Sequence, residues 1–108
     1  MNKREALTLL PLPYEGFLTT SGLHKKFHVF KNGRLQFSYL LKARYDSKRR
    51  KYDADILKEV PGEKDMATVW CSSGSFATSA LAERKLLEVL RSCIADLVDD
   101  IEAERADD

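Results

Sequence analysis

Two runs of alternating apolar and polar residues flank Asn32-Gly33, and together they predict a β-hairpin over residues 23–45. β-branched and aromatic residues are frequent in both runs, as they are in most strands. Two turn geometries fit the Asn-Gly pair. A two-residue turn pairs Lys31 with Arg34, whereas a three-residue turn with a bulge at the glycine pairs Phe30 with Arg34.

The apolar pattern favours the three-residue turn, because only that register gives the hairpin one apolar face. It pairs Phe27 with Phe37 and Val29 with Leu35, and it turns the odd-numbered side chains toward the core. Lys25 is the discordant member of this inward row. Since an inward lysine protects an unpaired sheet edge, we expect the first strand of the hairpin to be an edge strand.

A third strand follows the hairpin, because residues 52–56 alternate in the same way. Pairing Tyr45 with Tyr52 places Leu41 beside Ile56 on the inner face. On the other face this register sets opposite charges across the ladder, with Arg44 beside Asp53 and Lys42 beside Asp55. Both faces therefore agree on one register.

A fourth strand is predicted over residues 66–71. Its expected register turns Trp70 inward beside Ile56 and Val69 outward beside Leu57. An apolar stripe thus crosses the outward face, where water is expected.

The stripe consists of Leu40, Leu57 and Val69, and it predicts a protein interface. Either the leucine-rich segment over residues 7–18 covers it, or another subunit does. Connection lengths favour the N-terminal segment.

One long α-helix is predicted over residues 78–104, with Thr78 or Ser79 as its N-cap. Its apolar positions recur at alternating spacings of three and four: Leu87, Leu90, Ile94, Leu97 and Ile101. Residues 105–108 are predicted to form an acidic tail at the C-terminal end of the helix. The helix dipole is negative at that end and therefore repels acidic side chains.

These elements predict an α+β fold, a four-stranded antiparallel β-meander with one long C-terminal α-helix packed on one face. We expect a single domain over residues 1–108, with the sheet in residues 23–71 and an N-terminal segment in residues 1–22. That segment is predicted to be a short helix or an extended apolar stretch, because Pro11 and Pro13 stop any helix that starts before them.

A composition of 44% hydrophobic and 32% charged residues is that of a folded chain. No apolar run reaches the roughly 20 residues of a membrane span, and we find no secretory signal pattern. We therefore expect a cytoplasmic protein without a membrane partner. Cys71 and Cys93 are expected to be reduced, packed thiols.

Charge is distributed unevenly along the chain. Residues 1–52 carry twelve Lys and Arg against three acids, whereas residues 53–108 carry six against fourteen. Such asymmetry predicts either an anionic partner for the basic half, or packing of the two halves against each other or against a second copy.

Residues 71–78, Cys-Ser-Ser-Gly-Ser-Phe-Ala-Thr, end a predicted strand and lead into the helix. They resemble the phosphate loop of cysteine-dependent protein tyrosine phosphatases, with Cys71 in the place of the nucleophile. The segment departs from that pattern at Ala77, where the phosphate-gripping arginine should stand, and at Trp70, where a histidine should precede the thiol. We therefore expect no enzyme, and either an anion-binding helix start or a loop that caps its own helix.

Metal chemistry is not expected either. His24 and His28 have a metal-ligand spacing only on a helix, whereas on a strand they lie roughly 13 Å apart. We predict no metal site and no cofactor.

Cations and an exposed aromatic ring on the outward hairpin face form a candidate surface for single-stranded nucleic acid. The candidate residues are Lys26, His28, Phe30 and Arg34, followed by Lys48, Arg49, Arg50 and Lys51 in the next connection. The order of elements, four strands and then one long helix, resembles that of Whirly-type single-stranded DNA-binding domains. The competing interpretation is a solvated sheet face with internal ion pairs.

The leading hypothesis from sequence is therefore a small non-enzymatic binding module that contacts nucleic acid through the basic hairpin face and residues 48–51. The alternative is a protein-interaction, inhibitor or assembly module. It would use the stripe of Leu40, Leu57 and Val69 or the acidic helix end, and would pair with a second copy of itself or another protein.

Overall fold

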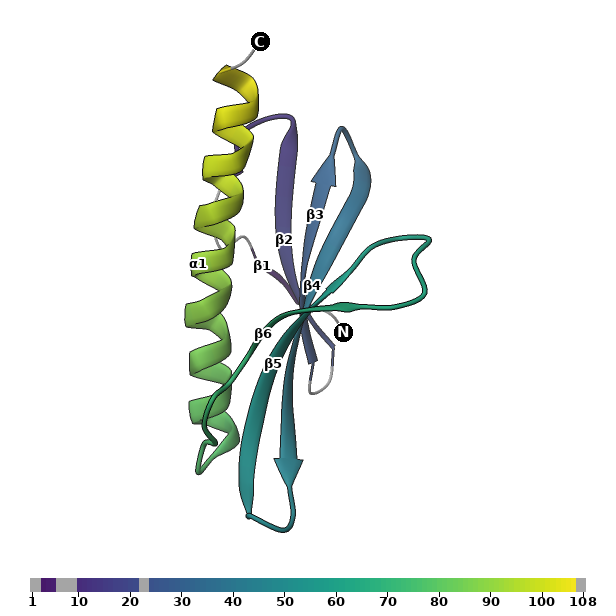
Figure 1. The fold of residues 1–108 in the computed structure, drawn as a ribbon. Helices are drawn as coiled ribbons and strands as arrows, with labels where there is room; N and C mark the ends of the chain where they lie inside the picture. Colours follow the sequence, from purple (N-terminus) through teal and green to yellow (C-terminus); the bar gives the residue numbers. More distant parts are fainter. Residues whose placement is uncertain (1–2, 6–9, 22–23, 107–108) are drawn as a thin grey trace.

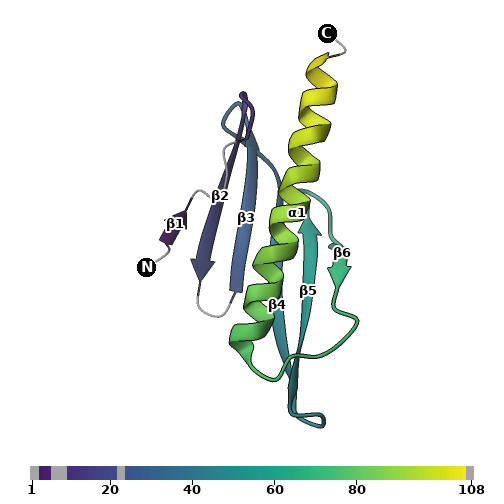
Figure 2. The ribbon, with the colours of Figure 1, turned by 90° about the vertical axis from the view of Figure 1, so that its left-hand side faces the viewer.

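A computed structural model describes residues 3–5, 10–21 and 24–106 of the chain. They form one long helix and a six-stranded antiparallel sheet whose strands lie in chain order. The elements are β1 (Lys3–Glu5), β2 (Tyr14–Ser21), β3 (His24–Lys31), β4 (Arg34–Asp46), β5 (Lys51–Glu59), β6 (Ala67–Cys71) and α1 (Ser79–Ala106). Figure 1 shows α1 along one side of the sheet, and Figure 2 shows it crossing in front of β4 and β5. The predicted α+β class and C-terminal helix are confirmed.

The sheet has two more strands than the four predicted, because β1 and β2 extend it on the N-terminal side. β2 pairs with β3 along its whole length, so the extended alternative for the N-terminal segment is correct over Tyr14–Ser21. The helical alternative fails at Lys3–Glu5, which is a strand, and residues 6–9 lie outside the described part of the chain. β3 has a neighbour on both sides, so the prediction of an edge strand there is wrong.

The β3–β4 turn has two residues and not three, which corrects the predicted register. Lys31 pairs with Arg34, and both central residues have positive φ, 53° at Asn32 and 77° at Gly33. These angles define the type I′ turn, whose twist matches that of the flanking strands. The predicted pairing of Phe27 with Phe37 is therefore replaced by Phe27 with Tyr39.

A bulge nevertheless exists in this hairpin, three residues away from the turn. Phe30 pairs with Leu35 and Val29 with Phe37, so Gln36 is the extra residue in β4. One extra residue reverses the direction of every side chain beyond it. The odd positions beyond the bulge therefore face α1 as predicted, and both Phe27 and Phe37 belong to the core or pack against it. Leu35 lies before the bulge, where it pairs with Phe30 on the side away from α1 and is 40% exposed. The predicted pairing of Val29 with Leu35 and the inward direction of Leu35 are therefore wrong.

The register between β4 and β5 is the predicted one. Tyr45 pairs with Tyr52, Leu41 with Ile56 and Leu40 with Leu57. Between β5 and β6, Ile56 pairs with Trp70 as expected, but a second bulge then shifts the register. Leu57 lies opposite Thr68 and not opposite Val69, so the predicted Leu57–Val69 pairing is wrong.

The core lies between α1 and the inner face of the sheet. Thr78 is the N-cap, since its Oγ1 accepts a hydrogen bond of 3.2 Å from the Leu81 amide. The helix buries a stripe of small and branched side chains against the strands: Ala82, Leu86, Leu90, Ile94 and Ile101. No helix within the described residues has the length and apolar character needed to span a bilayer.

Candidate functional site

The outer face is the side of the sheet opposite α1. Neither a helix nor a second sheet from the described residues lies over it (Figure 1). Its side chains alternate along the strands with the buried ones: Phe17, Thr19, Lys26, His28, Phe30, Ser38, Leu40, Lys42, Arg44, Asp53, Asp55, Leu57 and Glu59. A sheet with one face on the core usually presents a mainly polar second face to water.

Two leucines occupy the middle of the outer face. Leu40 and Leu57 are direct partners across β4 and β5, and each is half-buried. Val69, the third member of the predicted interface, is the extra residue of the bulge in β6 and is 41% exposed. The structure thus brings two of the three predicted interface residues together.

The N-terminal segment does not cover these leucines within the described residues. Tyr14–Ser21 lie in the sheet itself, and Leu10 is part of the core on the other side. The expectation that residues 7–18 cover the stripe is therefore wrong for its described part, and residues 7–9 lie outside it.

A row of polar side chains crosses β2, β3 and β4 next to the leucines. His28 lies between two hydroxyls, with its Nε2 3.0 Å from Thr19 Oγ1 and its Nδ1 2.7 Å from Ser38 Oγ. Ser38 is only 4% exposed although none of the described elements lies over it. Both ring nitrogens of the histidine are thus engaged in hydrogen bonds within the sheet.

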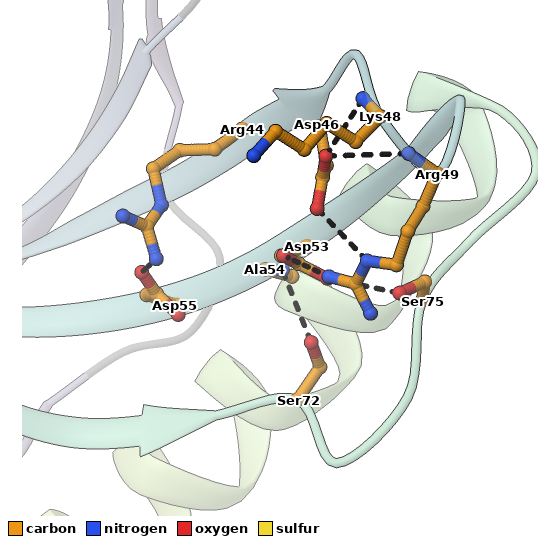
Figure 3. A network of polar contacts seen from close by, with 9 residues as sticks. All are labelled: Arg44, Asp46, Lys48, Arg49, Asp53, Ala54, Asp55, Ser72 and Ser75. Atoms are coloured by element: carbon orange, nitrogen blue, oxygen red, sulfur yellow. Dashed lines mark hydrogen bonds and ion pairs between the residues drawn. The ribbon is translucent and has the colours of Figure 1, made fainter.

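Two cations of the outer face, Lys26 and Arg44, have acidic partners. Lys26 Nζ lies 3.1 Å from Glu59 Oε2. Arg44 reaches diagonally to Asp55, at 2.8 Å, and not to its direct neighbour in the ladder (Figure 3). The face is therefore nearly balanced in charge.

Arg49 holds the β4–β5 turn together. Its Nε donates to Asp46 at 2.8 Å and its Nη2 to Asp53 at 2.8 Å (Figure 3). The hydrogen bond from the guanidinium holds the pKa of the Asp46 carboxyl below its ordinary value, and the same contact raises the pKa of Arg49. The Arg49 guanidinium is therefore already paired with two carboxylates, those of Asp46 and Asp53.

The other predicted nucleic-acid contacts are not on one surface. Lys48 and Arg50 in the β4–β5 turn, and Lys51 at the start of β5, are exposed and have no ion pair among the described residues. Arg34 begins β4 and the turn ends it, so about 40 Å of strand separates them. Phe30 lies edge-on to the Phe17 ring at 6.0 Å.

The loop after β6 lies along the edge of β5 and does not form an open cradle. The Ser72 amide donates to the Ala54 carbonyl at 2.8 Å, and Phe76 and Tyr52 exchange two backbone hydrogen bonds of 2.8 Å. Ser75 Oγ donates to Asp53 at 3.0 Å. The adjoining pocket of about 260 Å³ is lined by Arg44 and Arg49 but also by Asp53 and Asp55, which would repel an anion.

No three side chains of His, Cys, Asp and Glu come together as a metal-binding group in the described part of the chain. His24 is exposed and His28 belongs to the polar row. Cys71 is exposed, Cys93 is partly buried, and both are free thiols.

A second hollow lies under the N-terminal half of α1, and sequence reasoning missed it. It has a volume of about 480 Å³ and contains an ion pair of 2.6 Å between Lys25 and Glu83. The signal was present in the sequence, because Lys25 was the discordant member of the inward row. Edge protection was the wrong explanation for it.

Comparison of this chain with protein-family models, with curated proteins and with solved structures finds no match.

Proposed function

We propose that this protein is a non-enzymatic binding module that associates with a second copy of itself through the outer face. One observation carries the proposal. Leu40 and Leu57 lie side by side at the centre of a sheet face that no described element covers. Burial of half-exposed leucines in an interface releases about 25 cal/mol for each Å² of apolar surface. The cytoplasm remains the predicted compartment.

The charges around these leucines favour a second copy over a nucleic acid. Lys26 and Arg44 already have carboxylate partners, Glu59 and Asp55. A phosphate backbone needs cations that are not already paired. A copy related by a two-fold axis instead presents the same balanced set of acids and bases, and a two-fold interface must be self-complementary.

The dimensions of the face fit a small interface of this kind. Four strands at about 4.8 Å and seven residues at about 3.3 Å give a patch of roughly 19 by 23 Å. Its flat area is about half of the roughly 800 Å² that each partner buries in a standard-size interface, before the relief of the side chains is counted.

Solution mass tests the proposal, measured by light scattering on the full chain. The chain mass is 12.3 kDa, and we expect about twice that value for the wild type. Leu57→Lys should yield the monomer, because it places a charge in the centre of the buried patch. The matched control is Leu81→Lys on α1, where the leucine is already 44% exposed and the dimer should persist. A wild type that remains monomeric at high concentration contradicts the proposal.

Nucleic-acid binding is the second candidate, and the exposed turn between β4 and β5 supports it. Lys48 and Arg50 in this turn, and Lys51 where β5 begins, are exposed without an acidic partner among the described residues. Three such cations contribute to affinity for a single strand in a salt-dependent way.

Fluorescence anisotropy with a labelled oligothymidylate tests this candidate. Replacing Lys48, Arg50 and Lys51 together by alanine should abolish salt-dependent binding. Replacing Arg84, Lys85 and Arg91 on α1 removes the same charge from another element and should preserve binding. Equal loss in both variants indicates a general charge effect and rejects the turn as a site.

A further inference from the structure

The hollow under α1 is large enough for a small molecule and is mostly apolar. Its described lining comes from β2–β5 and from the first two turns of α1: Thr20, Lys25, Leu41, Ala43, Tyr45, Tyr52, Ser79, Glu83 and Leu86. Its volume of about 480 Å³ falls within the range of about 300–1,000 Å³ that is typical of ligand sites. A few polar groups among apolar walls are also typical of such sites.

Small side chains on the sheet account for the space. The inner row here contains Ala43 paired with Ala54, where neighbouring rows hold Leu41 with Ile56 and Tyr45 with Tyr52. Two alanines leave a depression between larger neighbours. Leu41 and Leu86 form its apolar walls, and each is 3% exposed.

Aromatic rings border the pocket. The Tyr45 and Tyr52 rings have centroids 5.1 Å apart, with their planes at 56°. Tyr45 is 56% exposed although it lies on the side of the sheet that α1 covers, so its ring stands at the mouth. A flat ligand ring can pack against such a pair.

Lys25 is the basic group in the described lining of the pocket. Its side chain is 25% exposed, whereas that of its partner Glu83 is 48% exposed. A charge between a helix and a sheet is costly to desolvate unless it is paired, so the lysine requires an anion. Glu83 can turn toward solvent at little cost and leave Lys25 to an incoming carboxylate.

We propose that this pocket binds a small, flat, mainly aromatic molecule that carries one carboxylate. The ring lies over Ala43 against Tyr45 and Leu86, and the carboxylate accepts a hydrogen bond from Lys25 in place of Glu83. This site is separate from the outer face, because it lies on the other side of the sheet.

Two probes that share one ring system, one anionic and one neutral, test the proposal on the full-length chain. Naphthalene-2-carboxylate and the neutral naphthalene-2-methanol are titrated separately, and amide shifts are followed by heteronuclear NMR. We expect the carboxylate to bind more tightly by about tenfold, as for one charge-assisted hydrogen bond. The shifted amides should include those of Lys25, Ala43, Tyr45 and Glu83. Shifts confined to the outer face, or no binding of either probe, overturn the proposal.

Two lysine variants test the contribution of the Lys25 charge separately from that of the apolar cavity. Lys25→Met keeps the apolar stem and should reduce affinity for the carboxylate about tenfold while leaving the alcohol within about twofold. Lys42→Met, on the outer face of the neighbouring strand, is the matched control and should change neither affinity. A Lys25→Met variant that weakens both probes equally rejects the role of the lysine.

Filling the pocket gives an independent readout. Ala43→Leu should abolish binding of both probes, because it occupies the depression between the larger rows. Tyr45→Ala acts at an exposed position, so it is tolerated by the fold, and it should weaken both probes by removing one wall. Unchanged affinity in Tyr45→Ala, or in a folded Ala43→Leu variant, overturns the placement of the ring.

Discussion

Gly16 illustrates how a missing side chain makes room for an aromatic ring of the core. A Cβ atom at this position would lie 2.4 Å from Cζ of Phe27 and 3.1 Å from Cδ1 of Leu10. The Phe27 ring is fully buried and cannot move aside without leaving a cavity. The absence of a side chain at Gly16 therefore allows the ring to lie over β2.

We predict that Gly16→Ala lowers the free energy of unfolding by about 1–3 kcal/mol, the range for overpacked cores. Gly74→Ala is the matched control, because a Cβ there has no neighbour within 4 Å and the backbone lacks a positive φ. Urea denaturation of both variants measures the difference. Equal stabilities would show that the Phe27 ring moves aside without cost.

The two cysteines differ in surroundings. Cys71 is exposed at the end of β6, whereas Cys93 faces the sheet from α1. Burial raises the pKa of the Cys93 thiol, and the charge of Asp96 raises it further. Only the thiolate is nucleophilic, so a raised pKa and restricted access both slow the reaction.

We therefore predict two phases when the native protein reacts with a disulfide reagent near neutral pH. Cys71→Ser should remove the fast phase and Cys93→Ser the slow one. Denaturation should make the two thiols equally reactive. Fast labelling of both thiols in the native protein would contradict the burial of Cys93.

At the scale of elements, the β4–β5 turn depends on a carboxylate that stays ionised. Asp46 accepts hydrogen bonds from the amides of Lys48 and Arg49, at 3.0 and 3.3 Å, in addition to the guanidinium of Arg49. Since the pKa of Asp46 is lower in the folded state than in the unfolded state, this carboxylate stabilises the fold above its unfolded pKa. That contribution is lost as pH falls through the folded pKa.

Carbon-detected NMR titration of the Asp46 carboxyl is the corresponding measurement. We predict a midpoint below the ordinary aspartate value in the wild type and a return toward that value in Arg49→Ala. Arg50→Ala, one residue away, is the control and should leave the midpoint unchanged. An unshifted midpoint in the wild type would contradict the stabilising contact between Arg49 and the Asp46 carboxylate.

The elements that the sequence predicts well are those with long, uninterrupted patterns. The helix and the β4–β5 register follow from apolar spacing and cross-strand charges that agree with each other. β2 was missed because Gly16 occupies an inward position where an apolar side chain is expected, and because Thr19, Thr20 and Ser21 are also common in turns. The Phe27 ring from β3 fills the space above Gly16, and the sequence pattern of β2 alone does not reveal this contact.

The hairpin shows a further limit of sequence reasoning. Alternation correctly predicted which side chains face the core beyond the bulge, but it placed Leu35 on the wrong face because it did not locate the extra residue. A bulge at Gly33 and a bulge at Gln36 turn the side chains that follow Gln36 toward the same face of the sheet. The apolar pattern of those residues therefore cannot distinguish the two positions. The type I′ turn prevails because Asn32 and Gly33 both tolerate positive φ.

The candidate site was predicted only in part, for a related reason. Leu40 and Leu57 were correctly placed together because their strands have no bulge between them. The nucleic-acid residues were grouped by charge, but charge alone does not reveal which cations are paired. Arg49 and Lys26 have carboxylates from β5 as partners, and these contacts depend on side-chain reach across the folded sheet.

For the whole molecule, the uneven charge of the sequence becomes a separation between its two ends. The principal extents are 52 × 30 × 27 Å. The basic β4–β5 turn lies at one end, and the acidic last turns of α1 lie toward the other (Figure 1). Contact between the two halves is made in part by the ion pair of Lys25 and Glu83. The outer face lies between these ends and has little net charge, as expected of a surface that pairs with its own copy.

The central claim is that Leu40 and Leu57 meet their counterparts in a second chain. A sample that mixes methyl-labelled chains with chains carrying a different isotope label reports contacts between copies alone. We predict intermolecular nuclear Overhauser effects between the methyl groups of these two leucines and the partner's outer face, with none from Leu81. An absence of such effects at Leu40 and Leu57 at concentrations where the mass is that of a dimer would contradict the claim.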